Sequence, residues 1–96
     1  MKYMEPNDTV AILKSLADET RLSLVRRLAE IDNEVIGSEI VTDCSAALKL
    51  SQPTMSHHFS KLVGANILIE RKAGVEKFYR LNKELLENIG IDPNKL

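Results

Sequence analysis

Apolar residues recur every three or four positions through the first half of the chain, a spacing that places side chains on one face of a helix. We therefore expect a first helix capped by Asp8 and a second helix capped by Asp18. The stripes predicted to face inward are Val10, Leu13, Leu16 and Ala17 in the first helix, and Leu22, Val25, Leu28 and Ala29 in the second. Asp32 and Asn33 interrupt this pattern, and the β-branched pair Val35-Ile36 predicts a brief edge strand.

A third helix is predicted to open at Gly37 and Ser38 and to end in a turn at Lys49 and Leu50. Its apolar side is expected to consist of Ile40, Cys44, Ala47 and Leu48. Another helical pattern follows at once. Two helices joined by so short a turn predict a helix-turn-helix, in which the second helix reads DNA.

The fourth helix carries the most informative pattern in the chain. It is expected over about residues 52–65, capped by Ser51 and ended by Asn66, because asparagine tolerates the left-handed conformation of many helix ends. Its apolar stripe is Met55, His58, Phe59 and Leu62. Its other faces carry Gln52, Thr54, Ser56, His57, Ser60 and Lys61. A solvated face is usually rich in Glu and Lys, whereas these donors and acceptors suit base edges and phosphates.

After Asn66 the apolar period changes from helical spacing to alternation, which predicts a β-hairpin over about residues 67–81. We expect its turn at Ala73 and Gly74, with alternation resuming at Val75. Asn82 can then cap a short final helix with Leu85, Leu86 and Ile89 as its apolar contacts. The predicted fold is mainly α with a small β-hairpin: a winged helix-turn-helix that forms a helical dimer, in a single domain over residues 1–96.

Charge is unevenly distributed along the chain. The formal net charge is −1, but residues 49–80 hold six Lys or Arg against two Asp or Glu, a local charge of +4. Residues 1–48 hold five basic and nine acidic side chains, a local charge of −4. Because the local field steers a protein onto phosphates, the positive segment around the fourth helix favours double-stranded DNA as the partner. Chance unevenness, which is common in small domains, is the alternative explanation.

The amino terminus, the lengths of the apolar runs and the single cysteine indicate the compartment of the protein. The amino terminus lacks the apolar run of a signal peptide, and no apolar stretch approaches the roughly 20 residues that cross a bilayer. The single Cys44 cannot form a disulfide within the chain. We therefore expect a cytoplasmic protein with no membrane partner and no cofactor.

Two motifs resemble a known family. Residues 16–22 (LADETRL) resemble the pattern L-x-[D]-x-[TR]-R-[LI] of the arsenical-resistance-repressor (ArsR/SmtB) family. Residues 50–62 (LSQPTMSHHFSKL) resemble its reader helix, L-S-Q-[SP]-[TA]-[VM]-S-x-H-[LF]-x-x-L, and residues 67–81 look like its wing. The resemblance covers roughly residues 8–88 and is specific because the two helical motifs occur together.

The resemblance implies a homodimeric bacterial or archaeal transcriptional repressor. Members dimerise through their first and last helices and bind inverted-repeat operators, and many release DNA when a metal or another inducer binds. A small-molecule inducer is compatible with this chain. The chain lacks the ligands of the family's metal sites: the third helix carries one Cys where metal sensors often carry C-x-C, and residues 82–89 contain neither His nor Cys. A soft-metal site needs several thiolate or imidazole ligands, so we carry over no metal site.

The predicted DNA-binding residues combine the reader helix with the basic hairpin. They are Ser51, Gln52, Thr54, Ser56, His57, Ser60, Lys61, Arg71, Lys72 and Lys77. His58 is expected to be partly buried, and Cys44 to pack in the core rather than to sense metals or oxidants.

Two other classes of function are the alternatives to DNA binding. A winged helix used only for protein–protein contact would leave the fourth helix as a docking face and would need no basic wing. An enzyme is disfavoured because the chain shows no Gly-rich phosphate loop, nucleophile motif or clustered carboxylates. The operator, the regulated genes, the inducer, any sensing role of Cys44 and an inter-subunit metal site stay open at this stage.

Overall fold

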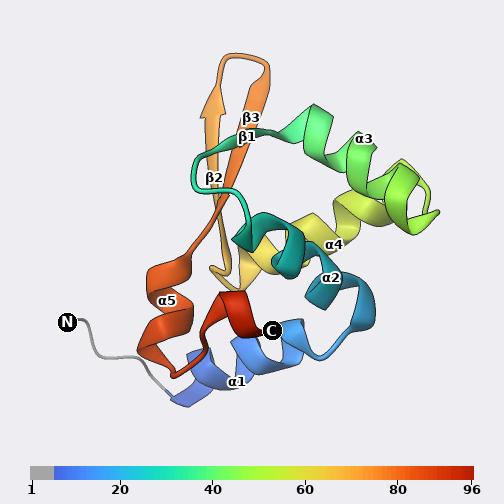
Figure 1. The fold of residues 1–96 in the computed structure, drawn as a ribbon. Coiled ribbons are helices and arrows are strands. Elements are labelled where there is room, and N and C mark those ends of the chain that lie inside the picture. Colours follow the sequence, from blue (N-terminus) through green and yellow to red (C-terminus); the bar gives the residue numbers. More distant parts are fainter. Residues whose placement is uncertain (1–5) are drawn as a thin grey trace.

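The computed structural model describes residues 6–96, and side-chain caps mark where several of its helices begin (Figure 1). Asp18 accepts a hydrogen bond from the N–H of Arg21 at 3.0 Å, Ser51 from that of Thr54 at 3.3 Å, and Asn82 from that of Leu85 at 3.3 Å. These three predicted caps are confirmed. The first helix begins at Pro6, so Asp8 lies inside its first turn and does not cap it.

The elements follow the predicted order. They are α1 (Pro6–Leu16), α2 (Glu19–Ala29), β1 (Val35–Ile36), α3 (Gly37–Leu48), α4 (Gln52–Gly64), β2 (Leu68–Ala73), β3 (Glu76–Leu81), α5 (Lys83–Asn88) and a closing 3₁₀ turn, η1 (Pro93–Lys95). Asn66, with φ of 63°, stands just beyond α4 as predicted, and Lys49, with φ of 57°, makes the turn between α3 and α4. The winged helix-turn-helix is therefore confirmed.

The core lies between α1, α2, α4 and the sheet, and the apolar stripes of three helices differ from the prediction. In α3, Ala47 is exposed, and Ser45, which was not predicted to face inward, is buried. In α1 the buried residues are Ile12 and Leu16, whereas Val10 and Leu13 are 48% and 50% exposed. In α2 the fully buried Leu24 was not anticipated. Helical spacing alone could not choose between the two apolar sides of α1, because both carry aliphatic residues.

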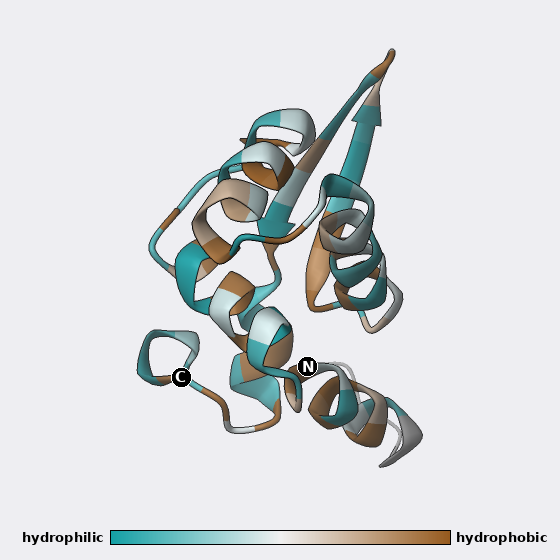
Figure 2. Cartoon of the chain, turned by 90° about the vertical axis from the view of Figure 1, so that its right-hand side faces the viewer, coloured by the Kyte–Doolittle hydropathy of each residue, from teal (hydrophilic) through white to brown (hydrophobic). Residues whose placement is uncertain are grey.

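The wing is a three-stranded antiparallel sheet in the order β1-β3-β2. The brief edge strand Val35–Ile36 is confirmed and pairs with Tyr79 and Phe78 of β3. Ala73 pairs with Glu76, so the hairpin turn is formed by Gly74 and Val75, one residue later than expected. Gly74 has φ of 63°, a conformation that glycine adopts without steric cost. Val75 therefore lies at the fully exposed tip rather than in a strand, and Figure 2 shows this apolar tip above largely hydrophilic strands.

Candidate nucleic-acid interface

Helix α4 divides into a buried face and an exposed face, as its sequence predicts. Met55, Phe59 and Leu62 are buried, and the Phe59 ring lies 5.2 Å from the Tyr79 ring of β3, centroid to centroid. All predicted site residues of this segment are exposed: Ser51, Gln52, Thr54, Ser56, His57, Ser60 and Lys61. The apolar face anchors the helix to the core and leaves the polar face free to meet a ligand.

A polar cluster beneath α4 ties it to the first two helices. The Arg21 guanidinium donates to the backbone carbonyl of Ser15 at 2.6 Å and lies 3.2 Å from Nδ1 of His58. Ser15 Oγ donates to the carbonyl of Lys61 at 3.3 Å. His58 is therefore partly buried, as expected, and Arg21 serves the scaffold. The N–H of Arg21 that hydrogen-bonds Asp18 holds the pKa of that carboxyl below its ordinary value, and the Arg21 charge adds to this effect.

The wing separates its basic residues onto two faces. Lys72 and Lys77 pair directly across the hairpin, so their side chains lie on one face, and the pairs Glu70–Tyr79 and Leu68–Leu81 lie on the same face. Tyr79 packs against α4, so this is the face that looks toward the helices. Of the three wing residues predicted to meet DNA, Lys72 and Lys77 thus share the side of the reader helix.

Arg71 lies on the opposite face of the wing. Its Nε and Nη2 atoms donate to the Glu34 carboxylate at 2.8–3.0 Å, and its guanidinium lies 4.5 Å from the centre of the Phe78 ring. The hydrogen bonds from Arg71 hold the pKa of Glu34 below its ordinary value. Arg71 therefore has a partner within the chain and lies apart from the two lysines.

A hollow of about 360 Å³ lies between α3, α4 and the wing. It contains Ser56, Ser60, Gln52 and Lys77, so the structure gathers these predicted residues around one space. It also contains Ser38 and Thr42 of α3, which the sequence analysis did not select. Gln52 Nε2 donates to Thr42 Oγ1 at 3.4 Å. The two missed hydroxyls stand four residues apart, on a side of α3 that the buried Cys44 does not occupy.

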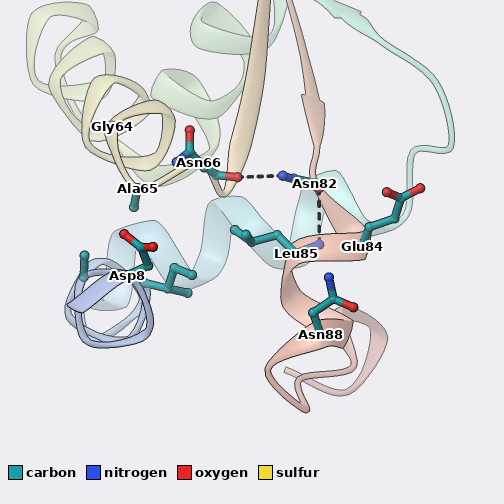
Figure 3. Close-up of a pocket in the computed structure, with 10 residues that line it drawn as sticks. Asp8, Gly64, Ala65, Asn66, Asn82, Glu84, Leu85 and Asn88 are labelled. Carbon is teal, nitrogen blue, oxygen red and sulfur yellow. Dashed lines mark hydrogen bonds between the residues drawn. The ribbon is translucent and has the colours of Figure 1, made fainter. Parts of the chain in front are cut away.

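A second hollow, of about 310 Å³, lies between α1, the end of α4 and α5 (Figure 3). Asn82 bridges it, accepting from the N–H of Leu85 and donating to the carbonyl of Asn66 at 3.0 Å. Asp8 and Asn88 face it from α1 and α5. None of the predicted DNA-binding residues lines it.

Residues 6–96 lack the features of a metal site and of a membrane span. This part of the chain contains no group of three His, Cys, Asp or Glu side chains placed to hold a metal ion. None of its helices combines the length and apolarity needed to span a bilayer. Cys44 is buried, as expected, and its burial raises the pKa of the thiol.

A helix-turn-helix with an exposed polar reader helix and a lysine pair on the same side defines a DNA-binding transcriptional regulator. Comparison with known proteins agrees. Residues 18–70 match the family described as bacterial regulatory protein, arsR family. The chain is 38% identical over 85 residues to the arsenical resistance operon repressor of Escherichia coli (strain K12), across 88% of this chain and 66% of that protein.

Two solved structures resemble the chain in both fold and sequence. The transcriptional repressor PagR of Bacillus anthracis is 32% identical with a TM-score of 0.67, across 92% of this chain and 94% of that one. HlyU from Vibrio cholerae N16961 is 32% identical with a TM-score of 0.63, across 91% and 98%. The chain belongs to the arsR family of bacterial regulatory proteins. It is a DNA-binding transcriptional repressor and not an enzyme, so the protein–protein alternative loses its support.

Proposed function

We propose that the chain acts as a homodimeric repressor that binds an inverted-repeat operator, with α4 of each protomer in one of two successive major grooves. One observation carries this proposal: the exposed polar face of α4 and the Lys72–Lys77 pair point to the same side of the molecule. A duplex lying on that side would meet hydrogen-bonding groups in its groove and cations beside its backbone at the same time.

The exposed residues divide by chemistry. Gln52, Thr54, Ser56 and His57 carry donors and acceptors suited to base edges. The residues suited to phosphates are Ser51, Ser60, Lys61, Lys72 and Lys77. Ser51 stands at the start of α4, where free backbone N–H groups also favour an anion. Arg71 is engaged by Glu34, so we propose for it a role in holding the wing to the segment before β1.

The proposed dimer uses α1 and α5. Val10 and Leu13 are half-exposed, and with the exposed Ala17 they form an apolar stripe on the side of α1 opposite the buried Ile12. A stripe that residues 6–96 leave exposed is the kind of surface that a second copy buries. A two-fold dimer would set the two α4 helices about 34 Å apart, one turn of DNA.

The inducer is proposed to be something other than a soft metal ion. The relative from E. coli is named for arsenical resistance, but this chain has one cysteine, which is buried. Even a dimer would bring only two such thiols, both inside packed protein. We expect arsenite, added to a preformed complex with the operator, to leave the bound fraction unchanged in a gel shift. Release by stoichiometric arsenite would contradict this part of the proposal.

The decisive experiment is selection of bound fragments from a random DNA library, together with light scattering on the protein alone. The expected outcome is a dimer that enriches an inverted repeat with half-site centres about 10–10.5 base pairs apart. A monomer that retains no DNA at low salt, or a dimer that enriches no symmetric site, would refute the proposed function.

A further inference from the structure

The hollow beside the reader helix brings hydroxyl groups and an ammonium group together from three elements. Helix α3 contributes Ser38 and Thr42, α4 contributes Ser56 and Ser60, and β3 contributes Lys77. Each hydroxyl pair stands four residues apart on its helix, so its members stack along one side. Helix α3 and strand β3 are far apart in the sequence, so only the tertiary structure brings this set together.

Lys77 points toward the start of α3. Its Cβ would lie 3.4 Å from a Cβ built on Gly37, so the side chain leaves the strand on the α3 side. Glu76 is acidic and also lines the hollow; it is the neighbour of Lys77 along the strand and pairs with Ala73. Because successive side chains in a strand alternate, the side chain of Glu76 leaves the strand on the face opposite to that of Lys77.

The hydroxyls are available to a ligand. The hydrogen bonds found among residues 6–96 do not engage the side chains of Ser38, Ser56 or Ser60. The Thr42 hydroxyl accepts from Gln52 Nε2 at 3.4 Å and keeps its own proton free to donate. All four residues, and Lys77, are exposed. Several O–H donors around one ammonium match the oxygens of a phosphate, which accept hydrogen bonds and carry negative charge.

We propose that this hollow seats one phosphate of the DNA backbone, held jointly by Ser38 and Thr42 of α3 and by Lys77 of the wing. The proposal rests on the function proposed above and extends it, because α3 then contacts DNA as well as supporting α4. Thr42 has a second task as a positioning residue, since its contact orients the amide of Gln52 beside the bases.

Acidic residues limit the path of the DNA strand. Glu39 and Asp43 line a neighbouring shallow hollow on α3 together with Ser38 and Thr42. A phosphate above these carboxylates would be repelled, so the strand must pass on the Lys77 side. Replacing Glu39 by Gln should therefore raise the affinity for operator and random DNA alike, by roughly two- to fivefold at low salt.

The test uses operator fragments in which single phosphates are replaced by neutral methylphosphonates, with affinities measured by gel shift at fixed salt. At one position per half-site we expect the substitution to weaken wild-type binding by roughly tenfold. The same substitution should cost little with a Ser38→Ala/Thr42→Val variant, because the contact is already lost. Thr42→Ser, which keeps the hydroxyl, should lose as much affinity as wild type on the methylphosphonate substitution. Lys77→Gln should lower the salt slope by about one.

The matched control is Ser23→Ala, which removes a partly exposed hydroxyl from α2, outside the proposed DNA and dimer surfaces, and should leave every affinity unchanged. Circular dichroism checks that each variant folds. If wild type and the Ser38→Ala/Thr42→Val variant lose equal affinity at every methylphosphonate position, the proposed phosphate contact in the hollow is refuted. The proposed function as a DNA-binding repressor is not affected by that result. Inorganic phosphate that perturbs the Ser38 and Thr42 amide resonances without such coupling would indicate a free-anion site and would overturn the assignment to DNA.

Discussion

At the scale of single residues, the interface separates side chains that can recognise bases from side chains that can only attract phosphates. Gln52 is exposed at the start of α4 and has both a donor and an acceptor, the combination that recognises adenine in a major groove. Lys72 has donors only and lies on the wing. Substitution of Gln52 should therefore alter the preference for the operator sequence, and substitution of Lys72 should alter the affinity for all DNA.

Gln52→Ala should relax operator preference. We expect the affinity for the selected operator to fall by about 1–3 kcal/mol while the affinity for random DNA changes little. Competition gel shifts at one salt concentration measure the ratio of the two affinities. An unchanged ratio would mean that Gln52 does not read the sequence.

Lys72→Ala should weaken binding to operator and to random DNA by the same factor, and should reduce the slope of log affinity against log salt by about one. The reason is that an ammonium group releases one counterion when it contacts a phosphate. Lys14→Ala is the control, because Lys14 is exposed on α1, away from the reader helix. Equal losses from the two variants would point to net charge rather than to a wing contact.

At the scale of elements, the start of α2 depends on one carboxylate. Asp18 accepts from the N–H of Arg21, which lowers its pKa from an ordinary value of 3.8. A lowered pKa in the folded state means that this contribution to stability is present above pH 3.8 and is lost as the pH falls through the folded-state value.

Asp18→Asn should keep a capping side chain but lose the charge. We expect it to destabilise the protein at neutral pH by well under about 1 kcal/mol, because Asp18 is one-third exposed. Below pH 3.8 the difference from wild type should shrink. Urea unfolding at several pH values measures the difference in free energy of unfolding between wild type and the variant. A difference that grows in acid would contradict the role of the Asp18 carboxylate as a charged cap.

Close packing of α3 against β3 depends on Gly37. A Cβ at this position would lie 2.9 Å from Cε2 of Tyr79 and 3.1 Å from the carbonyl oxygen of Lys77. We expect Gly37→Ala to destabilise the fold by about 1–3 kcal/mol, because the strand backbone and the packed Tyr79 ring must shift.

Gly64→Ala is the matched control for that change. Gly64 ends α4, and no atom among the described residues 6–96 lies within 4 Å of the added methyl group. Alanine should therefore stabilise the helix by about 0.5–1 kcal/mol. Thermal unfolding distinguishes the two variants by sign, and a Gly37→Ala protein as stable as wild type would refute the close approach.

At the scale of the whole molecule, DNA binding is expected to depend on the apolar stripe of α1. Leu13→Glu places a charge in the proposed dimer interface, so it should give a folded monomer whose operator affinity falls roughly tenfold or more, since the two half-sites no longer bind together. The control is Glu30→Lys, which changes more charge at an exposed position just beyond α2, away from that stripe, and should leave the dimer intact. Light scattering measures the oligomeric state of each variant, and gel shifts measure its operator affinity. A dimeric Leu13→Glu protein would exclude this interface.

Local sequence patterns predicted most of the fold. Capping residues Asp18, Ser51 and Asn82 have side chains that bond only to the adjacent backbone, so no tertiary information is needed to place them. Helix α4 has a single apolar side, formed by Met55, Phe59 and Leu62, so its buried face was unambiguous. Helix α1 has aliphatic residues on two sides, and the choice between them depends on what packs against it.

The sequence alone determined the order of elements, the helix-turn-helix and the exposed polar face of α4, because caps, periodicity and turn residues act over a few neighbouring positions. The tertiary structure alone decided which basic residues of the wing accompany that face. Lys72 and Lys77 face the helices while Arg71 turns away to Glu34, because strand register and the partner before β1 are set by residues far apart in the chain. For the same physical reason, only the packing of α3 against β3 brings Ser38 and Thr42 to the hollow that Lys77 also lines.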